Sequence, residues 1–199
     1  MGDYVGDNRW IPQGQSADEA GKLIWSTKSI NELMLALDQG YRPSVSMPFC
    51  TVLRRGNIVF EYTNEEVTEL AKCANDIVYF AEKYAVVMTD NGVQQVKLRD
   101  YQKQMLRDFQ HNRFNIVLAS RQMGKTVTAS IFNAWYLTFN YDKTTLLLAN
   151  KSESTKEIID KAKVVLENLP FFMKPGIIKY DVMNVRADNG CRLDRKSVV

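Results

Sequence analysis

The sequence predicts the α/β class, with a mostly parallel sheet flanked by helices and a small helical and mixed lobe at the N-terminus. Two apolar, β-prone stretches, 114–118 and 144–149, are each followed by a helical pattern with apolar residues at three- and four-residue steps. The composition is globular, because 45% of residues are apolar and 25% are charged. The 199 residues therefore allow one ordinary domain with a small appendage.

The first sixty residues predict an arm and a small lobe. Residues 1–15 are rich in Gly, Asp, Asn and Gln and predict a loose arm. Two short helical patterns follow at 18–25 and 30–37, and two β-like stretches, 51–53 and 58–62, predict a hairpin. Arg54 and Arg55 fall in its turn, where we expect solvated side chains.

A second helical region begins at residue 63. Thr63 and Glu66 have the spacing of a capping box, in which each side chain accepts the other residue's N–H. Apolar residues at helical spacing predict one helix from this cap to Tyr84. We expect Cys73 to fill core space on that helix.

The stretch from Phe114 to Thr126 carries the chemistry. An apolar run enters a short loop that closes on Gly124-Lys125-Thr126, and a helical pattern follows. This is the strand, loop and helix of a phosphate-binding P-loop, although Ala119 stands where the pattern has its first glycine. In that motif backbone N–H groups surround phosphates, the lysine reaches the same phosphates, and the threonine hydroxyl ligates Mg²⁺. The alternative is a chance Gly-Lys-Thr turn.

Arg121 adds a cation inside this loop. A guanidinium there can stabilise charge on the γ-phosphate in the transition state, as an arginine finger supplied by the same chain. The alternative is that Arg121 only holds the loop through an ion pair.

Tyr101 and Gln102 precede Lys125 by about twenty residues. An aromatic ring can stack on adenine, and the glutamine amide offers both a donor and an acceptor to the edge of the base. The alternative is an amphipathic helix in which Tyr101, Met105 and Phe109 belong to the core.

Other patterns limit the function. The net charge of +3 is too small to indicate nucleic-acid binding by itself. Cys50, Cys73 and Cys191 lack the spacing of a metal site or a disulfide framework, which favours a reduced, cytosolic setting. No apolar run approaches ~20 residues, and the start is polar, so we expect no membrane span and no secretion signal. His111, the single histidine, is expected at a surface turn.

The last sixty residues predict a helix and a hairpin. Ser152 or Ser154 can cap a long helix to Leu169, whose lysines are expected to form a solvated face. Strands at 177–180 and 182–187 and a turn at Asp188-Asn-Gly190 follow.

With these segments in order, the chain resembles the large terminase subunit of T4-like tailed bacteriophages, the motor ATPase that packages DNA. The similarity covers roughly residues 60 to 193. The strings that carry it are Asp76-Ile-Val-Tyr-Phe-Ala-Glu82, Leu98-Arg-Asp-Tyr-Gln102, Ser120-Arg-Gln-Met-Gly-Lys-Thr126, Leu166-Glu-Asn-Leu-Pro170, Lys174-Pro-Gly-Ile177 and Asp188-Asn-Gly190.

The resemblance implies a P-loop ATPase that uses ATP and Mg²⁺, with Arg121 as the catalytic residue. The residues it assigns to the nucleotide are Tyr101, Gln102, Ser120, Arg121, Gln122, Met123, Gly124, Lys125 and Thr126, and Thr126 is the one assigned to the metal. It also implies double-stranded viral DNA, the portal ring and the small terminase subunit as partners, and a homo-oligomeric ring on the portal. The implied place is the cytoplasm of an infected bacterial host, transiently on the prohead.

The chain departs from the family in two ways. No apolar strand ending in Asp-Glu follows Ala149, so the Walker B carboxylates and the nuclease domain are missing, and residues 61–193 are expected to be the first half of the ATPase domain. Turnover is therefore expected to be nearly absent. Residues 194–199 are what a common sequencing adapter gives when its DNA is translated in frame, which predicts a non-native tail.

Two other functions stay open. A helicase or translocase of superfamily 2 type can also place Tyr-Gln before its phosphate loop, but such loops usually have Gly or another small residue where Met123 stands. A non-catalytic nucleotide-binding remnant is the second alternative, and the missing Asp-Glu supports it for this chain.

Overall fold

The computed structural model describes residues 53–56, 61–90 and 92–197, and the backbone of three short strands before them. Strands β1 (Asp3–Val5) and β2 (Arg9–Ile11) pair antiparallel, where the composition predicted a loose arm. Strand β3 (Tyr41–Arg42) pairs antiparallel with β4 (Leu53–Arg54), and most of the predicted hairpin between 51–53 and 58–62 lies outside the described residues. The helical patterns at 18–25 and 30–37 lie outside the described residues.

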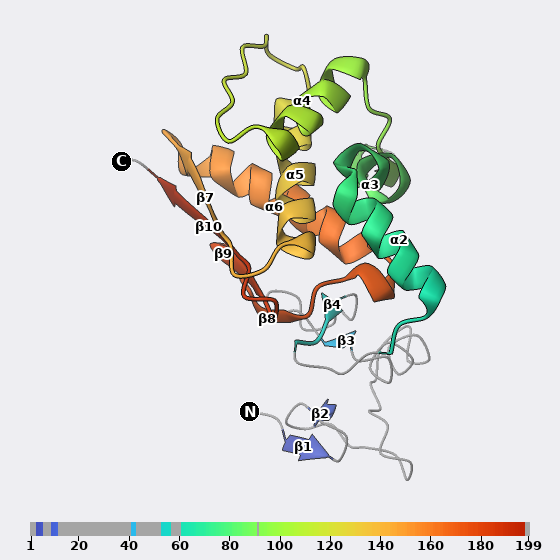
Figure 1. Ribbon diagram of the computed structural model, residues 1–199. Helices are drawn as coiled ribbons and strands as arrows, with labels where there is room; N and C mark the ends of the chain where they lie inside the picture. Colours follow the sequence, from blue (N-terminus) through green and yellow to red (C-terminus); the bar gives the residue numbers. More distant parts are fainter. Residues whose placement is uncertain are drawn as a thin grey trace.

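Five α-helices and one short 3₁₀ helix follow in the described part of the chain (Figure 1). They are α2 (Asn64–Asn75), α3 (Ile77–Tyr84), α4 (Asp100–His111), α5 (Lys125–Phe139), α6 (Ser152–Asn168) and η1 (Phe171–Met173). The helices after residue 98 agree closely with the sequence patterns. A hairpin of β5 (Val86–Thr89) and β6 (Gly92–Gln95) separates α3 from α4.

The helix predicted from residue 63 to 84 is divided. The capping box at its start is confirmed, since Thr63 N–H donates to Glu66 at 2.8 Å and Glu66 N–H to the Thr63 hydroxyl at 3.3 Å. Asp76 then leaves the helical conformation with φ −132° and ψ 103°. Its carboxylate accepts the N–H groups of Val78 and Tyr79, and so starts α3 as a new helix. An internal aspartate cap, invisible to hydrophobic periodicity, is the reason for the difference.

The main sheet has four strands in the order β7-β10-β9-β8. Its members are β7 (Thr144–Ala149), β8 (Ile177–Tyr180), β9 (Asn184–Ala187) and β10 (Arg192–Ser197). Only β7 and β10 are parallel, and the other two pairs are antiparallel. The prediction of a mostly parallel sheet is therefore wrong for the described residues. Short turns join β8 to β9 and β9 to β10, and such connections can link only antiparallel neighbours.

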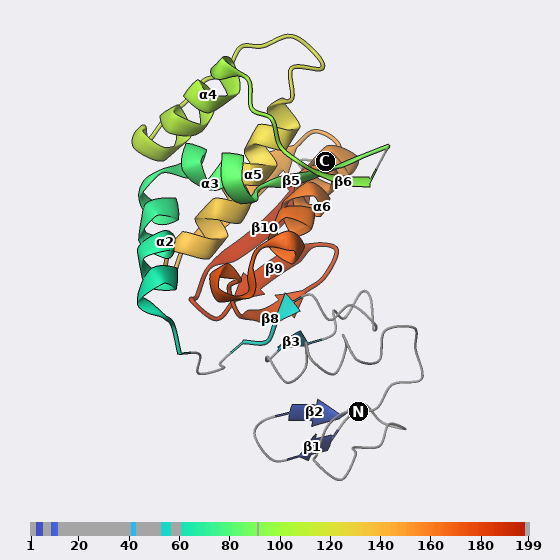
Figure 2. The same cartoon turned by 90° about the vertical axis from the view of Figure 1, so that its right-hand side faces the viewer.

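Helices cover one face of this sheet. Figure 2 shows α5 and α6 on the same side of β9 and β10, and α6 contacts both β7 and β10. Along β7, exposure alternates, so that Leu146 and Leu148 are 48% and 60% exposed while Leu147 packs against the core. The described helices thus flank one face of the sheet.

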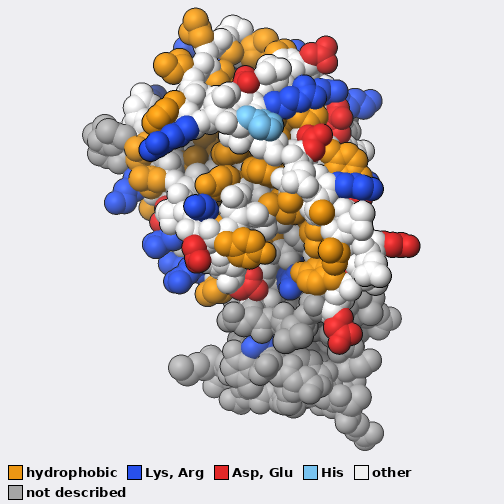
Figure 3. Space-filling view, in the orientation of Figure 1, with side chains coloured by type: hydrophobic (Ala, Val, Ile, Leu, Met, Phe, Trp, Pro, Cys, Tyr) orange, Lys and Arg blue, Asp and Glu red, His pale blue; other side chains and the backbone are white. Residues whose placement is uncertain are grey.

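The strand expected before the phosphate loop does not form. Residues 114–120 have no regular structure, and Phe114, Ile116 and Leu118 are 81%, 100% and 99% exposed. Figure 3 shows apolar side chains exposed at the upper end of the molecule, where Figure 1 places this loop. A continuous apolar strand is typical of a central strand, which has a neighbouring strand on each side and is covered on both faces. None of the described strands pairs with this segment.

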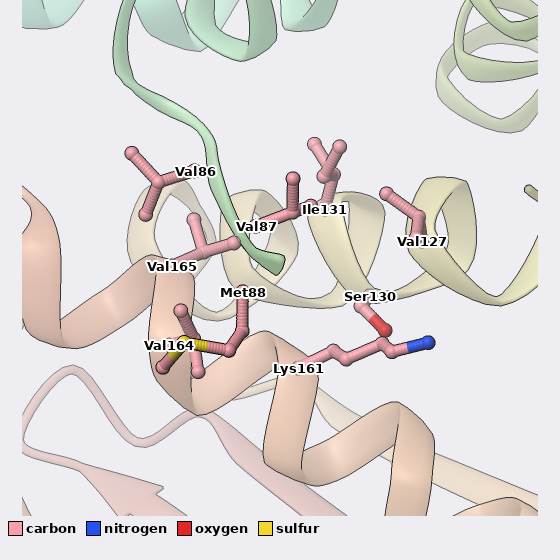
Figure 4. A pocket seen from close by; sticks show the side chains of 9 residues that line it. All are labelled: Val86, Val87, Met88, Val127, Ser130, Ile131, Lys161, Val164 and Val165. Carbon is pink, nitrogen blue, oxygen red and sulfur yellow. The ribbon is translucent and has the colours of Figure 1, made fainter. Parts of the chain in front are cut away.

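The core lies between the helices and the covered face of the sheet. It includes Phe80, Leu106 and Ile131 from α3, α4 and α5, and Leu53 from β4 joins it at 1% exposure. A small apolar hollow remains between β5, α5 and α6 (Figure 4). Its lining residues include Val87, Val127 and Val165. Among the described residues, no helix is long and apolar enough to cross a bilayer.

Two cationic side chains differ from the expectation of solvated surfaces. Arg54 is 8% exposed and donates to the Tyr62 hydroxyl and to the carbonyl of Lys174. Lys163 is 9% exposed on α6, where it donates to the carbonyl of Asp181 and lies 4.6 Å from the Tyr180 ring centroid. Burial lowers the pKa of Lys163. Long aliphatic stems can be buried while the charged end finds a carbonyl, which sequence patterns do not reveal.

The start of α6 also differs from the prediction. Lys151 occupies the N-cap position, and no side-chain cap is present there. The hydroxyl of Thr155 instead donates to the Ser152 carbonyl at 2.9 Å.

Candidate nucleotide site

The site is built around the first turn of α5. Gly124 is the N-cap residue and has the left-handed conformation, φ 69° and ψ 18°. Its carbonyl accepts the backbone N–H and the hydroxyl of Thr128, at 3.0 and 3.1 Å. The earlier N–H groups of the helix have no acceptor within the helix, and the helix dipole adds positive potential at this end. The start of α5 is therefore suited to an anion.

The preceding loop bends sharply. Gln122 has φ 62°, which is uncommon for a residue with a side chain. Two left-handed residues close together, Gln122 and Gly124, turn successive peptide groups in a way that is found in backbone anion sites. A side chain at 124 would also make Gln102 move, because a Cβ there would lie 2.4 Å from its Nε2.

Lys125 is directed back over this loop. Its Nζ donates to the carbonyls of Ala119 and Ser120, at 2.9 and 2.5 Å. The ammonium group thus lies within the turn that precedes its own helix. A phosphate oxygen, being charged, is a stronger acceptor for an ammonium than a neutral carbonyl. The lysine is placed where an anion at the start of α5 could compete for it.

The two residues predicted to hold the base are next to the loop. The Tyr101 hydroxyl on α4 donates to the carbonyl of Met123 at 3.0 Å. Gln102 is 8% exposed, and its Oε1 accepts the N–H of Arg99 at 3.0 Å. Tyr101 is 37% exposed, so its ring is partly open to solvent. The fold therefore joins the two sequence segments that were predicted to meet in one site.

The other predicted residues lie in the loop and in the first turn of α5. Ser120, Arg121 and Gln122 are exposed, and Met123 and Thr126 are partly buried. Sequence reasoning missed the carbonyl groups of the loop as partners of Lys125 and Tyr101. Every residue carries a carbonyl, so only the local conformation could have identified them.

Metal ligands are sparse. The described residues contain no group of three or more His, Cys, Asp or Glu side chains that could hold a metal ion. Thr126, the residue predicted to contact the metal, lies in the first turn of α5. His111 ends α4, where its Nδ1 contacts the carbonyl of Arg107 at 2.9 Å, as expected of a surface residue.

The carboxyl end of the chain takes part in the sheet. Strand β10 pairs with β7 from Arg192 to Ser197, and so includes part of the predicted non-native tail. That prediction concerns the coding DNA, and it stays a prediction, as do the proposed domain boundaries.

Comparison with known families gives a match. Residues 116–198 match the family described as terminase large subunit, T4likevirus-type, N-terminal. The matched region contains most of the loop before α5, the helices α5 and α6, and the four-stranded sheet. This part of the chain is therefore similar to the N-terminal region of a T4-like terminase large subunit, which supports the resemblance drawn from the sequence.

Proposed function

We propose that this chain binds ATP with Mg²⁺ at the start of α5, as the ATPase part of a terminase large subunit. In the whole protein, hydrolysis would drive double-stranded viral DNA into the prohead. The observation that carries the proposal is the contact between Tyr101 and Met123, at 3.0 Å. It places an aromatic side chain suited to a base beside a loop suited to phosphates.

Each residue has a role in this proposal. Lys125 binds the β- and γ-phosphates, with the backbone N–H groups of residues 120–126 around them. Thr126 offers its hydroxyl to Mg²⁺, and the ion neutralises phosphate charge when bound. Arg121 is exposed at the rim, where its guanidinium can contact the γ-phosphate as a catalytic arginine. Tyr101 stacks on adenine, and Gln102 contacts the edge of the base.

The partners are proposed from the family alone. They are the viral DNA, the portal ring and the small terminase subunit, with several copies of the large subunit arranged as a ring on the portal. The proposed place is the cytoplasm of an infected bacterium and, transiently, the prohead.

A direct titration tests nucleotide binding. The 199-residue chain is titrated with ATP in the presence of Mg²⁺, and the Lys125→Ala variant is titrated in parallel. We expect the variant to bind at least about tenfold more weakly, because a charge-assisted contact to phosphate is lost. Lys72→Ala is the control, since Lys72 is exposed at the end of α2 and away from the loop. Equal affinity of the wild type and Lys125→Ala would contradict the site.

A second candidate is binding without turnover. After Ala149 the sequence has no apolar strand ending in Asp-Glu, the pair that would hold Mg²⁺ and activate water. We propose that this chain alone binds ATP and releases phosphate no faster than Lys125→Ala does. A steady-state phosphate assay decides: faster release by the wild type would show that the 199 residues are a competent ATPase.

A further inference from the structure

The contacts of α4 with the phosphate loop reach its backbone. The Tyr101 hydroxyl binds the Met123 carbonyl at 3.0 Å, and the Gln102 amide lies against Gly124, where a Cβ would be 2.4 Å from Nε2. Met123 and Gly124 are joined by one peptide group. Two adjacent residues of α4 therefore contact both sides of the same peptide bond.

This peptide group has a direction that matters for an anion. A trans peptide is planar, and its C=O and N–H point in opposite directions. When Tyr101 holds the Met123 carbonyl, it also directs the Gly124 N–H away from α4. That N–H belongs to the loop that precedes the first turn of α5. The tyrosine hydroxyl thereby fixes the orientation of one donor that the proposed phosphate site uses.

Gln102 is itself held in place. Its Oε1 accepts the Arg99 N–H at 3.0 Å, and the side chain is 8% exposed. With one end of the amide bound, Nε2 is confined to the side of Gly124. Gly124 has no side chain, and this leaves the space that the amide occupies. The Gln102 amide therefore occupies space that a side chain at position 124 would need.

We infer that Tyr101 and Gln102 are positioning residues for the phosphate half of the nucleotide, in addition to any contact with the base. This inference rests on the proposed function. It extends that function, because a base-reading pair would act only on the nucleobase. Positioning of the Met123–Gly124 peptide acts on any polyphosphate, with or without a base.

The experiment compares ATP with inorganic tripolyphosphate, which has no base. Affinities for both are measured by titration for the wild-type chain and for Tyr101→Phe. The variant keeps the aromatic ring and loses only the hydroxyl that binds Met123. We expect it to bind both ligands about three- to tenfold more weakly, the range that follows from loss of one hydrogen bond. Stacking alone predicts no change for either ligand.

Two further variants are measured beside Tyr101→Phe, one as a control and one as a second test. Tyr141→Phe is the matched control, since Tyr141 is 76% exposed after α5, and it should bind as the wild type does. Gln102→Met keeps the length of the side chain and removes the amide, and tripolyphosphate affinity should again fall. Thermal unfolding midpoints show whether each variant is folded. If Tyr101→Phe lowers the stability of the fold, the tripolyphosphate affinity of Gln102→Met decides whether the positioning role holds.

The outcomes are distinct. Weaker tripolyphosphate binding by folded Tyr101→Phe or Gln102→Met supports the inference. If the wild type binds both ligands and the variants bind tripolyphosphate within about twofold of it, the positioning role is overturned and the proposed function stands. A wild-type chain that binds neither ligand overturns both.

Discussion

Glu69 shows how single residues join the two helices that the sequence presented as one. Its carboxylate on α2 accepts hydrogen bonds from Lys83 at 2.6 Å, Tyr84 at 2.8 Å and Tyr79 at 2.9 Å, all on α3. The hydrogen bond from Lys83 is the main cause that lowers the pKa of Glu69 to about 2, against the opposing effect of burial. The cluster therefore favours the ionised carboxylate and fixes the angle at Asp76.

The Glu69 cluster predicts a pH dependence of stability. The pKa of Glu69 falls from an ordinary 4.5 to about 2 on folding, so its contribution is present above pH 4.5 and is lost as the pH falls toward 2. Glu69→Gln should lower the free energy of unfolding at pH 7 by about 1–2 kcal/mol, because Lys83 is partly solvated and the ion pair is weakened. Urea unfolding at several pH values measures this. A difference from the wild type that stays constant between pH 5 and about 2 would contradict it.

Local geometry was predictable where neighbouring residues fix it. The Thr63–Glu66 capping box and the helix start after Gly124 could be identified from spacing alone. The burial of Arg54 and Lys163 could not, because each binds a carbonyl from a distant segment. The contact between Tyr101 and Met123 was predicted only as proximity.

At the scale of elements, the turn at Asp188-Asn-Gly190 anchors the C-terminal end of α5. The Asn189 side chain donates to the carbonyls of Leu137 and Asn140 at the end of α5, at 2.8 and 2.9 Å. Its Oδ1 accepts the N–H of Cys191 at 3.0 Å. One side chain thus satisfies carbonyls that a helix end leaves free and ties α5 to the turn between β9 and β10.

Loss of this cap should weaken the fold. Asn189→Ala removes all three hydrogen bonds, and we expect the free energy of unfolding to fall by about 1–3 kcal/mol, because partly buried carbonyls lose their donor. Asn189→Asp keeps the acceptor for Cys191 but places a carboxylate against two carbonyls at a helix C-terminus, so it should destabilise at least as much as Asn189→Ala. Asn115→Ala, at an exposed position, is the control and should change stability by less than about 0.5 kcal/mol. Denaturant unfolding that ranks Asn189→Ala with the control would contradict the anchoring role.

Helices were better predicted from the sequence than strands. The start of α5 and the extent of α6 follow from periodicity and from Pro170, which are local signals. The segment 114–118 has the composition of a strand, yet a strand needs neighbours that are distant in sequence. Such neighbours are not among the described strands, and the apolar side chains stay exposed.

At the scale of the whole molecule, the described sheet has helices on one face only. On the other face lie Leu146 and Leu148, together with the exposed cations Arg186, Arg192 and Lys196. Strand β7 is also an edge strand, which presents unpaired backbone groups. The apolar edge at β7 and the exposed loop 114–118 each favour association between chains.

Self-association should therefore depend on concentration and on β7. We expect sedimentation velocity to show species larger than the monomer, and Leu146→Thr with Leu148→Thr to shift the distribution toward the monomer. Threonine keeps the strand propensity and removes apolar surface. Met88→Thr, which removes a 63% exposed side chain from the β5 hairpin, serves as the control. An unchanged distribution in the double variant would locate the association elsewhere.

The fold class was predicted correctly at the level of mixed helices and strands, but the mostly parallel strand direction was not. Composition and periodicity identify elements, whereas strand direction depends on turns and on contacts far along the chain. Of the candidate site, the loop and the helix start follow from a local motif, and the structure brings Tyr101 of α4 against Met123. The roles of these residues toward a nucleotide stay predictions.

Hydrogen exchange with and without ATP tests the nucleotide site most directly. With saturating ATP and Mg²⁺, we expect slower exchange of the amides at 121–127, and of those at the start of α4 near Tyr101, while the β5 hairpin is unchanged. Lys125→Ala under the same conditions should lose this protection. Protection confined to other segments, or no change in the wild type at a concentration that saturates binding, would contradict a phosphate site at the start of α5.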